Sequence, residues 1–223
     1  ICAGRVPFVP DRGAAPVHED GLAWIAGARR QARTREAILE AARQIITEMG
    51  TDALSMRAIA DRIDYSPAGL YEYFGGKDEI VDAVCAEGGS RLFALMDQVE
   101  KNQPPAQYLQ AIGHAYIRFA VEQPDYFLLM FTSRSSVGSQ EEAAQSTESS
   151  AFGILLQAIR RGVETGVFKE RPGFEILTIA YAAWATVHGL AMLRVTHLQG
   201  FPVDFAASER ETLANFGRGL MAG

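Results

Sequence analysis

Residues 55–80 read SMRAIADRIDYSPAGLYEYFGGKDEI, and their pattern is the clearest indication of how the N-terminal part of the chain folds. Ser55 can cap a short helix, and Ser66 followed by Pro67 supplies an N-cap and a first-turn proline for a second one. The apolar positions of the first helix recur at helical spacing: Met56, Ile59, Ala60 and Ile63. Gly75 and Gly76 end the second helix. The stretch therefore predicts two short helices joined by a tight turn.

A longer amphipathic helix is predicted just before this stretch. Thr34 is its possible N-cap, and Gly50 can end it. Its apolar residues recur at helical spacing: Ile38, Ala41, Ala42, Ile45, Ile46 and Met49. One long helix that braces two short ones is the arrangement of a helix-turn-helix, in which one short helix crosses the DNA backbone and the other enters the major groove.

The start of the second short helix suits that docking. A major groove about 12 Å wide admits one helix, so residues at its tip must be small or must reach base edges. Pro67, Ala68 and Gly69 leave that room. Side chains that can donate to phosphate or place a positive charge beside it surround this tip: Ser66, Tyr71, Tyr73 and Lys77. Leu70 and Phe74 share one face at i and i+4, so we expect both in the core.

Residues 55–60, 65–74 and 77–80 together resemble the DNA-binding domain of the TetR family, over about Thr34 to Ile80. By that resemblance, phosphates are contacted by Ser55, Ser66, Tyr73 and Lys77. The same resemblance brings a second set close to bases or to the adjacent backbone: Arg57, Pro67, Ala68, Gly69 and Tyr71. Asp64 stands in the turn where the family often has glycine. An aspartate can adopt the left-handed conformation, so we expect the turn to survive.

Charge is distributed unevenly along the chain. The net charge is −6, yet residues 1–78 carry 10 basic and 11 acidic side chains, so the acidity belongs to the C-terminal part. Four arginines lie within seven residues: Arg29, Arg30, Arg33 and Arg35. This local charge density suits phosphate contact, although a solvated charged face explains it equally well.

The remaining sequence predicts an all-α protein in three parts. Residues 1–33 are expected to form a flexible N-terminal arm, residues 34–80 the helix-turn-helix domain, and residues 81–223 a larger helical domain for ligand sensing and dimerisation. Long helices are predicted at 77–100, 104–122, 124–131, 141–164, 174–197 and 208–220. The uncharged run at 176–193 reaches the threshold length for a membrane span, but its polar, alanine and glycine residues favour a buried helix.

Two segments of the larger domain, residues 124–131 and 184–189, resemble the WHG subtype of TetR C-terminal domains. The family resemblance implies a small-molecule effector within these helices and a homodimer formed through the last two helices. Candidate cavity residues are His114, Tyr126, Phe127, Met130, Phe131, Trp184 and His188. For His114 a satisfied core histidine is the leading alternative, and for Trp184 and His188 a role in the core is as good an explanation as a role in a pocket.

Signatures of catalysis and of metal binding are missing from the sequence. We find no Gly-x-Ser-x-Gly elbow, His-Glu-x-x-His motif, Cys-x-x-Cys pair or phosphate loop, so no catalytic residue, metal or cofactor is expected. Two well-separated cysteines and no recognisable signal peptide favour a cytoplasmic location. The sequence thus predicts a homodimeric, ligand-responsive repressor that binds palindromic operator DNA and no membrane. The alternative is an all-helical small-molecule-binding protein or enzyme without specific DNA binding.

Overall fold

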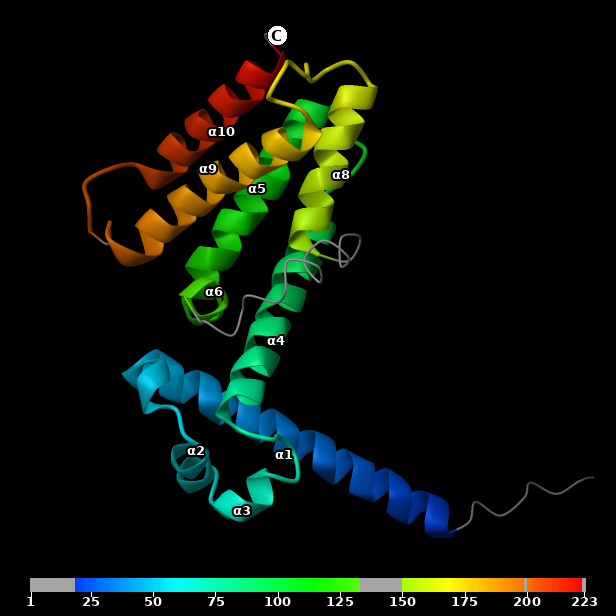
Figure 1. Cartoon of the computed structure of the whole chain (residues 1–223), viewed down its shortest axis with the longest axis vertical. Helices are drawn as coiled ribbons and strands as arrows, with labels where there is room; N and C mark the ends of the chain where they lie inside the picture. Colours follow the sequence, from blue (N-terminus) through cyan, green and yellow to red (C-terminus); the bar gives the residue numbers. More distant parts are fainter. Residues whose placement is uncertain (1–18, 133–149, 199, 222–223) are drawn as a thin grey trace, which may run out of the picture.

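The computed structural model describes residues 19–132, 150–198 and 200–221, and these ranges fold almost entirely into helices (Figure 1). An isolated bridge between Arg171 and Phe174 is their one β-type pairing. The all-α fold class is therefore confirmed. In chain order, the helices of the described residues are α1 (Glu19–Met49), the 3-10 helix η1 (Thr51–Ala53), α2 (Met56–Arg62), α3 (Pro67–Leu70), α4 (Lys77–Asp97), α5 (Pro105–Glu122), α6 (Pro124–Thr132), α8 (Ala151–Glu164), α9 (Ile176–Thr196) and α10 (Phe205–Met221).

The small N-terminal domain packs α2 and α3 against α1 around a compact apolar core. Helix α1 contributes Ile38 and Ile45 to this core, and both side chains are essentially inaccessible to solvent. Leu70 and Phe74 are also fully buried, as their shared helical face predicted. The guanidinium of Arg35 lies 4.4 Å above the ring of Phe74, which ties α1 to the end of the helix-turn-helix.

The first helix begins much earlier than the sequence analysis expected. The expectation of a flexible arm over residues 1–33 is wrong for 19–33, because α1 already begins at Glu19; the preceding residues lie outside the described part. Alanine, arginine and glutamine, which favour helix, predominate from residue 26 onward. Thr34 is consequently not an N-cap. It lies inside the helix, where its hydroxyl donates to the carbonyl of Arg30 at 3.1 Å.

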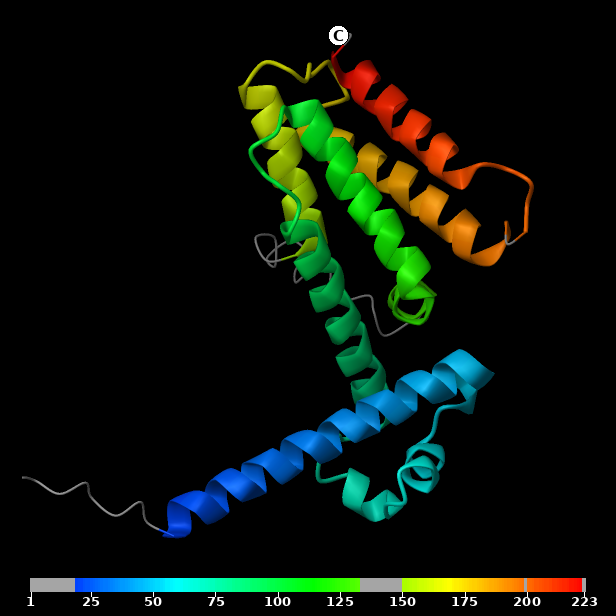
Figure 2. The same cartoon turned by 180° about the vertical axis from the view of Figure 1, so that it is seen from behind.

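In the larger domain the other helices pack around α5, which contacts α4, α6, α8, α9 and α10 (Figures 1 and 2). Helix α4 runs from the small domain into this bundle, so it connects the two parts without a break at residues 80 and 81. Helix α6 lies at the junction, in contact with both α4 and α1. Helix α8 begins at Ala151, where the Ser150 hydroxyl accepts from the amide of Gly153 at 3.0 Å; the earlier part of the helix predicted from residue 141 lies outside the described residues.

Helix α9 is long and apolar enough to cross a membrane, judged by length and composition alone. It packs instead against α5, α8 and α10 through a face that contains Ile179, Ala183 and Val187. On other faces Leu177 and Tyr181 remain 64% and 65% exposed. A helix that is apolar on several faces suits a position between its own bundle and a partner surface.

Candidate nucleic-acid interface and internal cavity

The two serines of the helix-turn-helix cap its short helices. Ser55 Oγ accepts a hydrogen bond from the amide of Ala58 at 3.1 Å, and Ser66 Oγ accepts one from the amide of Gly69 at 3.0 Å. Because each hydroxyl accepts in the cap, its own proton remains available to donate to a phosphate oxygen. Both residues are exposed, so capping and phosphate contact are compatible at these positions.

The turn between α2 and α3 has the backbone that the sequence analysis expected. Asp64 has a φ of 53° and is the only non-glycine residue with a positive φ in the described part of the chain. The amide of Tyr65 then donates to the carbonyl of Ala60 at 2.9 Å. Aspartate therefore makes the left-handed turn in the place of glycine.

The tip of α3 projects Pro67 and Ala68 into solvent, whereas Gly69 is half-buried. A Cβ atom added to Gly69 would lie 2.7 Å from Cε1 of Tyr65 and 2.9 Å from Oγ of Ser66. A side chain at this position would thus require the Tyr65 ring or the Ser66 hydroxyl to shift. Room for DNA was the only role predicted for Gly69, and its contact with Tyr65 was not predicted.

The remaining candidate contacts differ in how firmly the fold holds them. Arg57 is 86% exposed at its side chain and lies 3.9 Å from Asp61, and Tyr71 is 58% exposed. Tyr73 is half-buried, in an edge-to-face contact with Tyr65 at 6.3 Å between ring centroids. Arg57 and Tyr71 are consequently the predicted base-contacting residues with the longest free reach.

Lys77 is held by the 3-10 helix that follows α1. Its ammonium donates to the carbonyl of Thr51 at 2.9 Å in a partly buried setting. An ammonium has three donors, so two remain for a phosphate. Lys77 therefore has a structural role in joining the start of α4 to η1 in addition to its predicted role in binding DNA.

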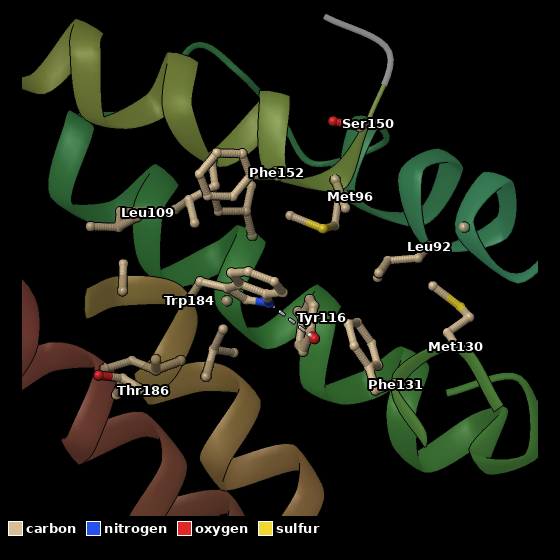
Figure 3. Close-up of a pocket in the computed structure, with 18 of the residues that line it drawn as sticks. Leu92, Met96, Leu109, Tyr116, Met130, Phe131, Ser150, Phe152, Trp184 and Thr186 are labelled. Carbon is tan, nitrogen blue, oxygen red and sulfur yellow. Dashed lines mark hydrogen bonds between the residues drawn. The ribbon is translucent and has the colours of Figure 1, made fainter. Parts of the chain in front are cut away.

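The larger domain contains a cavity of about 410 Å³, partly open to solvent, between α4, α5, α6, α8, α9 and α10 (Figure 3). Three of the predicted wall residues line it: Met130, Phe131 and Trp184. The other four do not. Phe127 is fully buried in the core, and His188 is half-buried and hydrogen-bonded to Tyr116. Tyr126 faces the junction with α1, and His114 is half-buried elsewhere on α5.

Aromatic and aliphatic side chains from helices far apart in sequence complete the cavity. These residues were not predicted from the sequence; among them are Leu92, Met96, Leu109, Tyr116, Phe152 and Phe216. In Figure 3 the Tyr116 ring lies between Trp184 and Phe131. Helical periodicity marks such residues as buried but does not distinguish a cavity wall from a filled core, so no signal in the sequence could have found them.

One polar cluster lies within this apolar wall. The Tyr116 hydroxyl is 2.9 Å from Nδ1 of His188, and Nε1 of Trp184 donates to the same hydroxyl at 3.4 Å, as the dashed line in Figure 3 marks. Burial raises the pKa of Tyr116 and lowers the pKa of His188 below its usual 6.5. Both groups are therefore uncharged near neutral pH, and the cavity presents a neutral hydroxyl.

Helix α6 joins the cavity to the DNA-binding domain. Its last turn carries Met130 and Phe131 in the cavity wall, and its first turn carries Asp125, 3.6 Å from the guanidinium of Arg43 on α1. The Tyr126 ring lies 4.7 Å from the guanidinium carbon of Arg91 on α4, and burial is the main cause that raises the pKa of Tyr126 to about 12. One short helix thus touches the cavity, α4 and α1.

Close packing holds α6 against α4. A Cβ atom added to Gly88 would lie 2.7 Å from Sδ of Met130 and 3.0 Å from Cδ1 of Tyr126. Any side chain at position 88 would therefore meet α6, so the absence of a Cβ at Gly88 lets α6 and α4 approach closely here.

Family models match both parts of the chain. Residues 38–84 match the model described as bacterial regulatory proteins, tetR family, and residues 109–216 match the model described as tetracyclin repressor-like, C-terminal domain. The chain is 30% identical over 95 residues to YobS of Bacillus subtilis, an uncharacterised HTH-type transcriptional regulator. The aligned region covers 42% of this chain and 49% of YobS. It is 35% identical over 72 residues to the HTH-type transcriptional repressor KstR of Mycobacterium tuberculosis, covering 32% of this chain and 33% of KstR.

These two matches span at most about half the length of the relatives concerned. A likeness of the whole fold comes from solved structures. The TetR family transcriptional regulator PfmR of Thermus thermophilus superposes with a TM-score of 0.63 at 24% identity, covering 82% of this chain and 98% of PfmR. The arrangement of helices is therefore shared from the N-terminal domain through the C-terminal bundle.

Proposed function

Because the chain belongs to the TetR family of bacterial transcriptional regulators, we propose that it is a repressor that binds a palindromic operator as a homodimer and is released by a small molecule in the cavity. The observation that carries the proposal is the helix-turn-helix, whose two capped helices expose a tip of Pro67 and Ala68. Similarity to the transcriptional repressor KstR supports repression as the regulatory outcome.

In this proposal α3 enters the major groove. Arg57 and Tyr71 reach base edges or the adjacent backbone beside the small tip of Pro67, Ala68 and Gly69. The predicted phosphate contacts are made by Ser55, Ser66, Tyr73 and Lys77. Because the tip has little capacity for hydrogen bonding to bases, Arg57 and Tyr71 supply much of the sequence selectivity.

The homodimer forms through α9 and α10 in this proposal. Large apolar side chains exposed on these helices support it: Leu177, Tyr181, Leu193 and Met221. A two-fold dimer reads half-sites about 34–36 Å apart, so a change in the spacing of the two α3 helices weakens contact with at least one half-site.

The effector is, we infer, an uncharged and largely apolar molecule with one polar oxygen. With the proton of His188 on Nδ1, His188 and Trp184 both donate to the Tyr116 hydroxyl, and the proton of this hydroxyl is free to donate to the effector oxygen. The lining residues that the structure describes are uncharged, and most are apolar. A buried ion without a partner costs several kcal/mol, so charged compounds are disfavoured in such a cavity. Its volume of about 410 Å³ falls within the range of about 300–1,000 Å³ typical of small-molecule sites.

Effector binding reaches DNA through α6 in this account. A ligand that displaces Phe131 or Met130 moves α6, and the contacts of Asp125 with Arg43 and of Tyr126 with Arg91 transmit that shift to α1 and α4. Because these helices carry the helix-turn-helix, the shift changes the separation of the two α3 helices.

Binding to the DNA upstream of the chain's own gene tests the proposal. Fluorescence anisotropy should detect salt-sensitive, sequence-selective binding, and Arg57→Ala should weaken it by about 1–3 kcal/mol. Arg160→Ala, at an exposed position on α8, is the matched control and should bind as the wild type. Ligand binding to the cavity without selective DNA binding would instead favour an all-helical small-molecule-binding protein or enzyme.

A further inference from the structure

The N-terminal half of α1 extends beyond the domain that it helps to build. Its packing face begins at Ile38 and continues through Ala41, Ala42 and Ile45. The part of the helix before Thr34 leaves the small domain and ends level with α3, at the end of the molecule remote from the larger domain (Figures 1 and 2). A DNA duplex seated on α3 would therefore pass close to this extension.

Three arginines occupy one side of the extension. Arg29 and Arg33 are spaced i and i+4, and Arg30 and Arg33 are spaced i and i+3, so all three lie within an arc of about 100°. All three are exposed. The residues from 27 to 35 include no aspartate or glutamate, and the ion pairs of the described residues include none of the three.

The fourth arginine of the cluster is used differently. Arg35 lies over the ring of Phe74 and belongs to the small domain. The other three contribute no such packing, and at helical spacing their like charges repel each other. A polyanion bound beside them relieves that repulsion, and the extended DNA backbone is the polyanion that the fold places nearest.

We propose that Arg29, Arg30 and Arg33 bind backbone phosphates of the DNA that flanks each operator half-site. The inference rests on the proposed docking of α3 in the major groove. At a rise of 1.5 Å per residue, Arg29 lies about 9 Å farther along the helix axis than Arg35, outside the reach of α3 itself. The contacts add affinity and lengthen the protected DNA without reading its sequence.

Two duplexes distinguish this role from operator recognition. Both contain the palindrome that the intact chain selects from a random-sequence library; one ends at the half-sites, and the other carries about ten further base pairs, close to one helical turn, on each side. The wild type should bind the longer duplex about tenfold or more tightly at physiological salt. The variant Arg29→Ala, Arg30→Ala, Arg33→Ala should lose this gain and keep the affinity for the shorter duplex.

The salt dependence supplies an independent readout. Each lost phosphate contact flattens the slope of log Kobs against log salt by about 0.9, so the triple alanine variant of a dimer should lose up to about 5 from the slope on the longer duplex. Alanine is the strongest helix former, so circular dichroism should show the helix retained. Replacing the same three arginines with lysine keeps the charges and should keep most of the gain.

An equal affinity of the alanine variant and the wild type for the longer duplex would overturn the inference, as would an equal loss on both duplexes. Loss of the gain in the lysine variant would also overturn it, because the contact would then not depend on charge. If the wild type selects no sequence at all, the proposed function fails and this inference fails with it. Selective binding to the shorter duplex without any gain from the flanks refutes only the role of the arginines.

Discussion

Asp125 on α6 lies 3.6 Å from the guanidinium of Arg43 on α1, and this ion pair joins the helix that lines the cavity to the helix that braces the DNA-binding domain. Both side chains are partly exposed, at 30% and 27%. A pair in that setting stabilises a fold by about 0–1 kcal/mol. Its position at the junction therefore has more consequence for coupling than for stability.

Asp125→Asn should uncouple the effector from DNA. The amide keeps the shape of the side chain but removes its charge, so α6 can move with less effect on Arg43. We expect the melting temperature to change little and DNA binding without effector to stay within about twofold of the wild type, since an exposed pair contributes about 0–1 kcal/mol. More effector should be needed to release DNA in an anisotropy titration. An unchanged release curve would show that the signal bypasses this pair.

Tyr116→Phe should separate the polar contact in the cavity from its apolar walls. Loss of one neutral hydrogen bond should weaken binding of dodecan-2-one by roughly fivefold to tenfold, about 1 kcal/mol, and leave binding of dodecane unchanged. Isothermal titration or quenching of Trp184 fluorescence measures both. Dodecanoate and dodecyltrimethylammonium serve as charged counterparts, and tight binding of either would contradict an uncharged effector.

Substitutions of two adjacent residues at the tip of α3 should have different effects: one should impair DNA binding and the other should lower stability. Ala68 is exposed, so Ala68→Trp should block entry into the major groove while the melting temperature is unchanged. Gly69→Ala should lower the free energy of unfolding by about 1–3 kcal/mol, because the added Cβ collides with Tyr65 and Ser66. Thermal unfolding beside gel-shift titration checks both. A Gly69→Ala protein of normal stability would show that the Tyr65 ring moves aside readily.

The buried imidazole of His188 should make stability depend on pH. Its pKa is lowered by burial from the usual 6.5, so the unfolded chain binds a proton more readily than the folded chain. The contribution of His188 is therefore fully present above about pH 6.5 and is lost as the pH falls below it. The difference between denaturation curves of wild type and His188→Gln, measured from pH 5 to pH 8, isolates this contribution. A difference that is constant over that range would contradict it.

The helix-turn-helix was predictable because local signals determine it. Ser55 and Ser66 as caps, Pro67 in the first turn and a left-handed Asp64 act within a few residues, and the structure has each of them in the expected conformation. The N-terminal extension was predicted incorrectly, because Thr34 looks like a cap until the favourable helix propensity of the residues before it is taken into account.

The cavity was only partly predictable. Met130, Phe131 and Trp184 were predicted correctly, but the other four candidates do not line the cavity: His114, Tyr126, Phe127 and His188. Which face of α6 turns toward the cavity depends on how closely α6 approaches Gly88 of α4, a contact between residues distant in the sequence. Periodicity indicates that a side chain is buried without indicating what it is buried against.

Spacing, capping and charge act over a few residues, so the sequence alone was sufficient to predict the helix-turn-helix, the capped tip of α3 and the cluster of arginines before Thr34. Three features could be seen only once the helices were packed: Tyr116 and not His188 lines the cavity, a Cβ atom at Gly69 would collide with Tyr65, and Asp125 contacts Arg43. Each of these depends on packing between separate elements, where close-packed side chains determine which atoms meet.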